Sequence, residues 1–368
     1  MQRFLLLLLA VFSCFAAEPE KLVVISIDGL DARLLRDADR LKLKIPNIAK
    51  LAKQGAVSTA VTAGPVDYTS VIVGAAKAGR KTALINASGA ATFAFPTPAA
   101  QHGAKAVEFE PISAASTPAK LADRVAKMFP SFDKQLWDDS SSAQAALYLL
   151  DAEKPDVLFV HFAELDAEQH ETSAMSVYAR AVLEIEDDWV GQIVAKAAPG
   201  SLIAVVSGNG FQNENHIVRP NVLLLQAKLP AGAKVAHGLI GTGDKAVAAY
   251  LRTLIGNKKY GIAREVPLAE VATRSPDLKN WIAGFDTLPD VVASQETRGA
   301  AYGAGSHKGV HPFWPTHTDF RSVFVIAGPG ILHRTLGPVD LVDVAPTLSE
   351  AIGLPPGKRR SVLRPATK

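Results

Sequence analysis

Four short, mostly apolar and β-rich runs recur along the chain, at residues 22–27, 157–162, 202–207 and 322–327. An apolar run of this length without polar alternation is typical of a strand that is covered on both faces. Helical patterns lie between these runs. The segment 46–55 begins with proline and ends with glycine, the residues favoured at the first position of a helix and just past its end. The pattern predicts a three-layer αβα fold with a mostly parallel, doubly wound sheet.

Three further segments shape the expected organisation. Residues 173–198 have the pattern of one long amphipathic helix, and we interpret its acidic run at 184–188 as a solvated face. Residues 87–118 are rich in Ala, Gly, Pro, Ser and Thr, which favours a loop-rich insertion. Residues 229–300 are expected to form a small cap.

The N-terminus has the order of a secretory signal. Arg3 precedes an apolar run at 4–15, and small residues follow it. We predict a signal peptide at 1–17, a folded domain at 18–368, and export to the periplasm or the exterior. The run is too short to span a membrane, so no transmembrane helix is expected in the mature chain. Lipoprotein anchoring at Cys14, the single cysteine, is the alternative that we disfavour.

Charge and cysteine content bear on two questions, whether the chain binds nucleic acid and which residue types could bind a metal. The chain has 39 Lys and Arg against 36 Asp and Glu, and the two signs are interleaved. No basic patch stands out, so we expect no nucleic-acid binding. A mature chain without cysteine must bind any metal through histidine and carboxylate groups.

Two carboxylates follow predicted strands, where ligands of such sheets bind. Asp28 comes directly after the first strand and precedes Gly29, a place for either a metal ligand or a helix cap. Asp166 and His170 are four residues apart, so on a helix both face the same way and could bind one zinc ion. His307 lies in a loop between two glycines, close to other histidines.

The order of these segments resembles the alkaline phosphatase superfamily, and most closely its type I phosphodiesterase/nucleotide pyrophosphatase branch. The likeness covers roughly residues 22–352 and rests on several motifs together. They are Asp28-Gly29, Pro46-Asn47, Gly64 to Gly74, Asp166 with His170, Ser207 to Phe211, Gly305 to Gly309, Ala327 to Ile331 and Val342 to Leu348.

The resemblance implies a site with two zinc ions, of which this chain retains one complete ligand set. Asp166, His170 and His307 correspond to the first set. The second set is Asp28, the nucleophile and an Asp-His pair, but that pair falls on Gly208 and Asn209. We therefore expect one divalent cation, predicted to be zinc, with Asp28 and Asn209 as weak further ligands.

The nucleophile position of the family falls on Gly64, which has no side chain with which to attack phosphorus. Thr62 is the nearest hydroxyl that a small shift of register would bring in as a substitute. Asp67 adds a carboxylate near Asp28, and either residue could serve as a base.

Two hypotheses follow from these residues. The first is an exported phosphoric ester hydrolase of the phosphodiesterase or pyrophosphatase type, which acts through a single metal without a covalent intermediate. The second is a pseudoenzyme, which binds a phosphorylated or other anionic envelope ligand without turnover. The partner in both cases is a phosphate ester or another anionic small molecule.

Overall fold

The computed structural model describes residues 21–62, 69–85, 106–109, 121–132, 138–317, 319–357, 359 and 361–364. The predicted signal peptide, Gly64, Asp67 and most of the loop-rich segment 87–118 lie outside this range. Within it, no helix is both long and apolar enough to cross a membrane.

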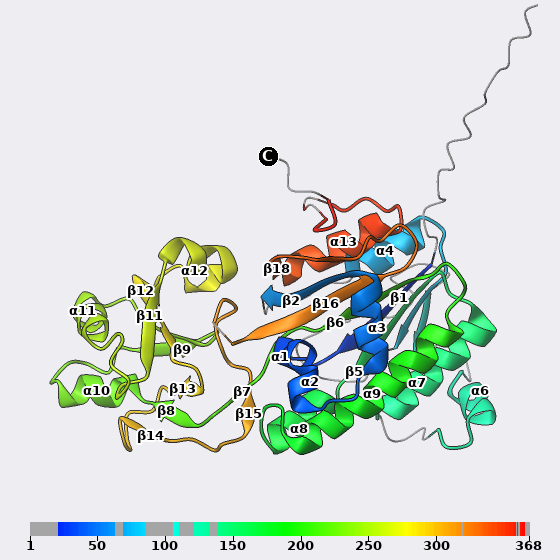
Figure 1. Ribbon diagram of the computed structural model, residues 1–368. Coiled ribbons are helices and arrows are strands. Elements are labelled where there is room, and N and C mark those ends of the chain that lie inside the picture. Colours follow the sequence, from blue (N-terminus) through cyan, green and yellow to red (C-terminus); the bar gives the residue numbers. More distant parts are fainter. Residues whose placement is uncertain are drawn as a thin grey trace, which may run out of the picture.

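A twisted sheet forms the centre of the larger lobe (Figure 1). Its strands run in the order β17-β2-β16-β6-β1-β5-β3-β4, and β18 also pairs with β2. Only β16 runs against its neighbours, β2 and β6, so the sheet is mostly parallel as predicted. The strands are β1 (Leu22–Ile27), β2 (Ala56–Thr62), β3 (Thr82–Ile85), β4 (Ala106–Phe109), β5 (Val157–Phe162), β6 (Leu202–Val206), β16 (Arg321–Ala327), β17 (Arg334–Thr335) and β18 (Val339–Asp340).

Helices cover both faces of this sheet, which confirms the three-layer αβα prediction (Figure 1). Odd and even positions of β1 belong to different apolar clusters, one on each face. Helices α4 (Thr69–Lys77) and α13 (Val344–Ala351) pack on one face. The other face is covered by α1 (Ala32–Arg36), α2 (Ala38–Leu41), α3 (Pro46–Gln54), α6 (Leu121–Met128), α7 (Asp139–Tyr148) with a π-helical turn at Leu149–Glu153, and α9 (Val177–Lys196).

A second lobe is inserted between β6 and β16 and has its own apolar core (Figure 1). One sheet of this lobe has the order β11-β12-β10-β9, and another has the order β13-β8-β14. The strands are β8 (His216–Val218), β9 (Lys234–Ala236), β10 (Leu239–Thr242), β11 (Ile262–Val266), β12 (Ala283–Thr287), β13 (Val291–Ala293) and β14 (Tyr302–Ala304); the helices are α10 (Pro220–Gln226), α11 (Lys245–Thr253), α12 (Leu268–Arg274) and a 3₁₀ turn at Pro276–Leu278.

A short ladder, which we call the neck, pairs the outgoing and the returning chain, and the segment after it still packs on the second lobe through Trp314. The outgoing strand β7 (Gln212–Asn213) pairs antiparallel with the returning strand β15 (Gly309–Val310). Strand β15 also lies against α8 (Glu164–Glu171), the short helix that follows β5. The neck therefore brings the returning chain to the carboxyl edge of the main sheet.

The acidic run 184–188 on α9 was interpreted as a solvated face, and this interpretation is wrong for two of its residues, Glu186 and Asp187. Glu186 and Asp187 are 1% and 0% exposed. Asp187 accepts hydrogen bonds from the backbone N–H groups of Asn47 (3.0 Å) and Ile48 (2.8 Å), at the start of α3. The first N–H groups of a helix have no partner within the helix, so a carboxylate from a neighbouring helix satisfies them.

Candidate metal centre

Asp28 lies at the carboxyl end of β1 and is fully buried. Its Oδ1 accepts a hydrogen bond from the N–H of Gly29 at 3.1 Å. The cap of α1 is instead Asp31, whose Oδ1 accepts from the N–H of Arg33 at 2.8 Å. Of the two interpretations considered for Asp28, the helix cap is therefore not what the structure shows.

Gly29 permits α8 to approach the end of β1. Its φ of 73° is in the left-handed region that favours glycine. A Cβ at this position would lie 3.2 Å from the Cα of Asp166 and 2.9 Å from the ring of Phe211. Asp28 and the first turn of α8 therefore lie at the same part of the sheet edge.

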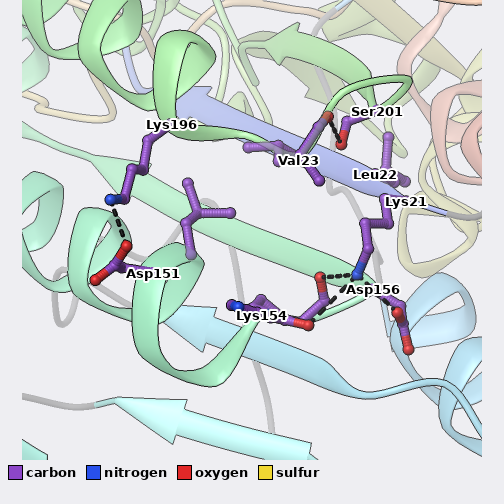
Figure 2. A pocket seen from close by; sticks show the side chains of 11 residues that line it. Lys21, Leu22, Val23, Asp151, Lys154, Asp156, Lys196 and Ser201 are labelled. Carbon is purple, nitrogen blue, oxygen red and sulfur yellow. Dashed lines mark hydrogen bonds and ion pairs between the residues drawn. The ribbon is translucent and has the colours of Figure 1, made fainter.

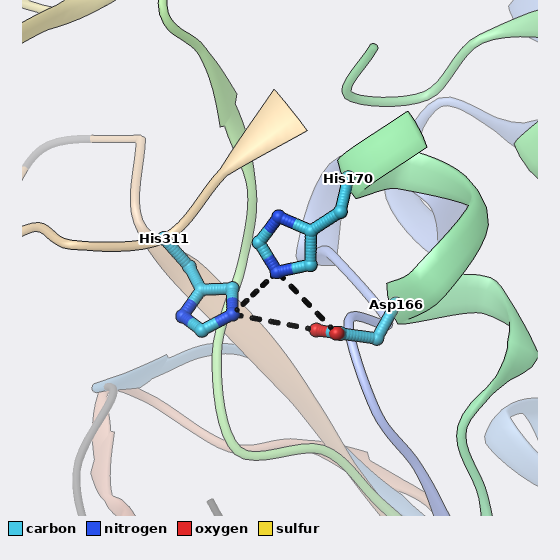
Figure 3. Close-up of side chains that lie close together, drawn as sticks. All are labelled: Asp166, His170 and His311. Carbon is cyan, nitrogen blue, oxygen red and sulfur yellow. Dashed lines mark hydrogen bonds and ion pairs between the residues drawn. The ribbon is translucent and has the colours of Figure 1, made fainter. Parts of the chain in front are cut away.

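Three side chains converge beside that edge: Asp166 and His170 from α8, and His311 from the segment after β15 (Figure 3). The two Nε2 atoms lie 3.0 Å apart. The carboxylate oxygens of Asp166 lie 3.5 Å from each of these nitrogens. Asp166 and His170 share one face of α8, as their spacing predicts.

His307, the third ligand expected from the sequence, is not part of this cluster. Its side chain is exposed, and its Nδ1 lies 3.2 Å from Oδ1 of Asn215. His311 occupies the place predicted for His307, because the pairing of β15 with β7 directs the chain after Val310 towards α8. A signal for His311 was present in the sequence, since Gly309-Val310-His311 has the same Gly-x-His spacing as Gly305-Ser306-His307.

Hydrogen bonding fixes the orientation of one imidazole. Nδ1 of His170 donates to the backbone carbonyl of Gly309 at 2.9 Å, which leaves the lone pair of Nε2 directed at the cluster. Phe211 packs edge-on against the rings of His170 and His311, with centroid distances of 5.0 Å. The carbonyl of Gly309 and the ring of Phe211 therefore hold His170, and His311 packs against the same phenyl ring.

Burial sets the protonation of the cluster. It raises the pKa of Asp166 from its usual 3.8 to about 6. It also lowers the pKa of His311 from 6.5 to about 4, and the neighbouring His170 adds to this effect. At pH 7 the carboxylate is therefore charged and His311 is neutral, the states in which both groups bind metals.

The donor set fits a divalent cation. Oδ1 of Asp166 is buried and accepts no hydrogen bond from any described residue. One ligand atom from each of the three residues lies within 4.8 Å of the others, and no other such group of three occurs in the described part of the chain. Two imidazoles and one carboxylate are a common ligand set of zinc sites that keep an open position.

The residues of the family's second metal set are only partly described. Asn209 is 2% exposed, and its Oδ1 accepts no hydrogen bond from a described residue. Thr62, at the end of β2, donates its hydroxyl to Oδ1 of Asp340 at 2.8 Å. Gly64 and Asp67 lie outside the described residues, so their roles stay predictions.

Gly309 lies where β15 presses against α8, and alanine there is expected to disturb the metal centre. An added Cβ would lie 2.4 Å from the carbonyl oxygen of Gln169 and 2.9 Å from the nitrogen of Ala174. We expect Gly309→Ala to lower the free energy of unfolding by about 1–3 kcal/mol, the usual cost of overpacking. We also expect weaker zinc binding, because β15 and His311 must move away from His170. Thermal denaturation and zinc titration measure the two effects.

Gly303→Ala is the matched control, since its Cβ would meet only the Cβ of Ala300 at an ordinary 3.6 Å. Unchanged zinc affinity in Gly309→Ala would contradict the close packing of β15 on α8 as the support of the centre.

Cavities also lie away from the metal centre. One of about 380 Å³ lies at the opposite edge of the sheet, where the ammonium groups of Lys21 and Lys196 pair with Asp156 (2.9 Å) and Asp151 (2.5 Å) (Figure 2). Another, of about 460 Å³, lies between α12 and β18. There an ion pair of 2.9 Å between Arg274 and Asp340 joins the two lobes.

Comparison with known proteins gives a family and a fold. The family model described as type I phosphodiesterase/nucleotide pyrophosphatase matches residues 66–308. No curated protein sequence matches the chain.

Solved structures with the same fold include an inactive variant of murine ectonucleotide pyrophosphatase/phosphodiesterase 5 in complex with AMP. It shares 12% identity at a TM-score of 0.57, over 93% of this chain and 97% of that chain. The human form of that protein aligns at 12% identity and a TM-score of 0.58, over the same shares. Phosphonoacetate hydrolase from Sinorhizobium meliloti, in complex with phosphonoacetate, aligns at 12% identity and a TM-score of 0.63, over 92% and 96%.

Proposed function

Since the chain belongs to the type I phosphodiesterase/nucleotide pyrophosphatase family of the alkaline phosphatase superfamily, we propose that it is an exported, metal-dependent hydrolase of phosphoric esters. One divalent cation, zinc in our proposal, is held by Asp166, His170 and His311. The observation that carries the proposal is the convergence of these three side chains, with a buried carboxylate oxygen that accepts no hydrogen bond from the described residues.

The residues around the cation would have different roles in hydrolysis. When bound, the cation acts as a Lewis acid on a phosphoryl oxygen. The carbonyl of Gly309 fixes the Nδ1–H tautomer of His170, so that Nε2 of the neutral ring faces the cation, and Phe211 packs against both imidazole rings. Asp28 is buried at the end of β1, directly before Gly29, which lies against α8, and we propose it as the base that takes a proton from the attacking water. Asp67 is the second candidate for that role.

A second candidate function is a pseudoenzyme that binds an anionic ligand without turnover. The absence of a hydroxyl at position 64 and of an Asp-His pair at positions 208 and 209 favours it. Loss of a nucleophile costs about 10⁶-fold in a serine protease, so the covalent route of the family is not expected here.

Hydrolysis assays separate these candidates. The panel includes a nitrophenyl monoester, a nitrophenyl diester, a dinucleotide and phosphonoacetate, because two structural neighbours bind AMP and phosphonoacetate. We expect zinc-dependent turnover of at least one ester, loss of turnover with a chelator, and recovery when zinc is added back. Absence of turnover by zinc-loaded protein across the panel would favour the pseudoenzyme.

Thr62→Ala tests whether the displaced hydroxyl acts as nucleophile. We expect the rate to stay within about threefold, because this hydroxyl is already engaged with Asp340. A loss of several orders of magnitude would instead identify Thr62 as a nucleophile.

A further inference from the structure

We propose that Asp139 and Glu186 are positioning residues, which together bind the first turn of α8 and thereby hold Asp166 and His170 in place for the cation. The proposal rests on the metal centre proposed above. Neither carboxyl group belongs to that centre, and each comes from a different helix, α7 and α9.

The two carboxyl groups accept three consecutive backbone N–H groups at the start of α8. Oδ1 and Oδ2 of Asp139 accept from Ala163 (2.8 Å) and Glu164 (2.9 Å). Oε1 of Glu186 accepts from Leu165 at 3.0 Å. These groups have no partner within the helix, so α8 depends on α7 and α9 for the hydrogen bonds of its first turn.

This contact lies directly before the metal ligands. Asp166 follows Leu165, and His170 lies one turn further along the same face. A helix of eight residues is marginal by itself and takes its position from its surroundings. A shift or rotation of the first turn would therefore move both ligands relative to His311, which comes from another part of the chain.

Burial and mutual contact favour a proton shared between the two carboxyl groups. Asp139 and Glu186 are 2% and 1% exposed and hydrogen bond to each other. Burial raises the pKa of both groups, and the facing carboxylate of Glu164 raises both further. Oε2 of Glu186 accepts no hydrogen bond from a described residue, which is consistent with this oxygen carrying the proton and donating it to Asp139.

This arrangement predicts different outcomes for two amide substitutions. In Glu186→Gln the amide oxygen still accepts from Leu165, and the NH₂ group donates to Asp139 as the protonated acid does. In Asp139→Asn one of the two acceptor oxygens becomes an NH₂ group that faces a backbone N–H. The glutamine variant should therefore preserve the position of α8, whereas the asparagine variant should not.

Asp187→Asn is the matched control. Asp187 is also buried on α9 and also accepts two backbone N–H groups, but those of α3 rather than α8. Both aspartate variants should lower the melting temperature through loss of a helix cap. Only Asp139→Asn should change the metal centre.

The experiment measures zinc affinity of the full-length mature protein by competition with a chromophoric chelator, and the visible absorption of the cobalt(II)-loaded protein. We expect Asp139→Asn to weaken zinc binding about 10- to 100-fold, as substitutions behind metal ligands usually do, and to change the cobalt spectrum. Glu186→Gln and Asp187→Asn should stay within about threefold of the wild type, with an unchanged spectrum.

Equal affinities of Asp139→Asn and wild type would overturn the proposal, as would a loss in Glu186→Gln equal to that in Asp139→Asn. If Asp139→Asn does not fold, Glu186→Met against Glu186→Gln decides: the methionine variant must lose affinity and the glutamine variant must keep it. Absence of zinc binding in the wild type would instead refute the metal centre itself.

Discussion

Replacing His311 with alanine is expected to weaken zinc binding by at least about 100-fold, because substitution of a residue merely behind a ligand already costs 10- to 100-fold. His311 supplies one of the two imidazole nitrogens, and its Nε2 lies 3.0 Å from that of His170. Asp166 and His170 both come from α8, so without His311 the cation has no ligand from the segment after β15. Chelator competition on the purified protein gives the affinity, and metal analysis after dialysis gives the stoichiometry.

His307→Ala is the control for this prediction, since His307 is the histidine that the motif alignment selects. The exposed side chain of His307 contacts Asn215 and not the trio. The zinc affinity of the His307→Ala protein should therefore equal that of the wild type. If His307→Ala loses zinc and His311→Ala keeps it, the trio seen in Figure 3 is not the metal centre.

Asp166→Asn is expected to have opposite effects on binding and on stability. It removes the only charged ligand of the trio, so zinc binding should be lost. In the metal-free protein, however, it should raise the free energy of unfolding by up to about 3 kcal/mol at pH 7.5, since one pKa unit corresponds to about 1.4 kcal/mol. The reason is that burial raises the pKa of Asp166 to about 6, so its charged form disfavours the folded state.

The stability gain of metal-free Asp166→Asn should depend on pH. A carboxyl group whose pKa rises on folding stabilises the folded state below its unfolded value near pH 4, and this contribution is lost as the pH rises towards 6. The advantage of Asp166→Asn should therefore vanish below about pH 4. Denaturant unfolding in the presence of a chelator, at several pH values, measures it.

Glu171→Gln, near the other end of α8, is the matched control because its side chain is 77% exposed. Its stability should change by no more than about 0.5 kcal/mol. A metal-free Asp166→Asn protein less stable than the wild type at pH 7.5 would contradict the assigned cost of the buried charge.

Four buried strands of the main sheet were predictable because each is a mostly apolar run rich in β-branched residues. The bounds of β1 and β5 equal the predicted ones, and β6 and β16 differ by one residue. The direction of β16 was not predictable, since an apolar run carries no information on polarity. Strand β2 was missed, because it alternates between buried and partly buried positions and includes small polar residues.

The candidate site was predictable only where its residues are neighbours in sequence. Asp166 and His170 lie on one face of α8 because helical spacing requires it. His311 is 141 residues from His170, and what brings them together is the pairing of two dipeptides in the neck. Two-residue strands have no hydrophobic period, so no sequence pattern identifies that pairing.

The burial of Glu186 and Asp187 was unpredictable for a related reason. Charge on a long helix usually faces solvent, and here two other helices begin against it. Which carboxylate accepts the free N–H groups at the start of a helix depends on how the helices pack in three dimensions. A short stretch of sequence carries no information on that packing.

The neck between β7 and β15 also bears on how such a protein diversifies. The second lobe begins and ends at one short ladder in sequence, and the segment after the ladder packs on it through Trp314. Replacement of residues between β7 and β15 would alter the surroundings of a substrate and leave the strand order of the main sheet intact, provided that the contacts of Trp314 are kept. Because His311 follows the ladder directly, it would stay aligned with α8 through such an exchange.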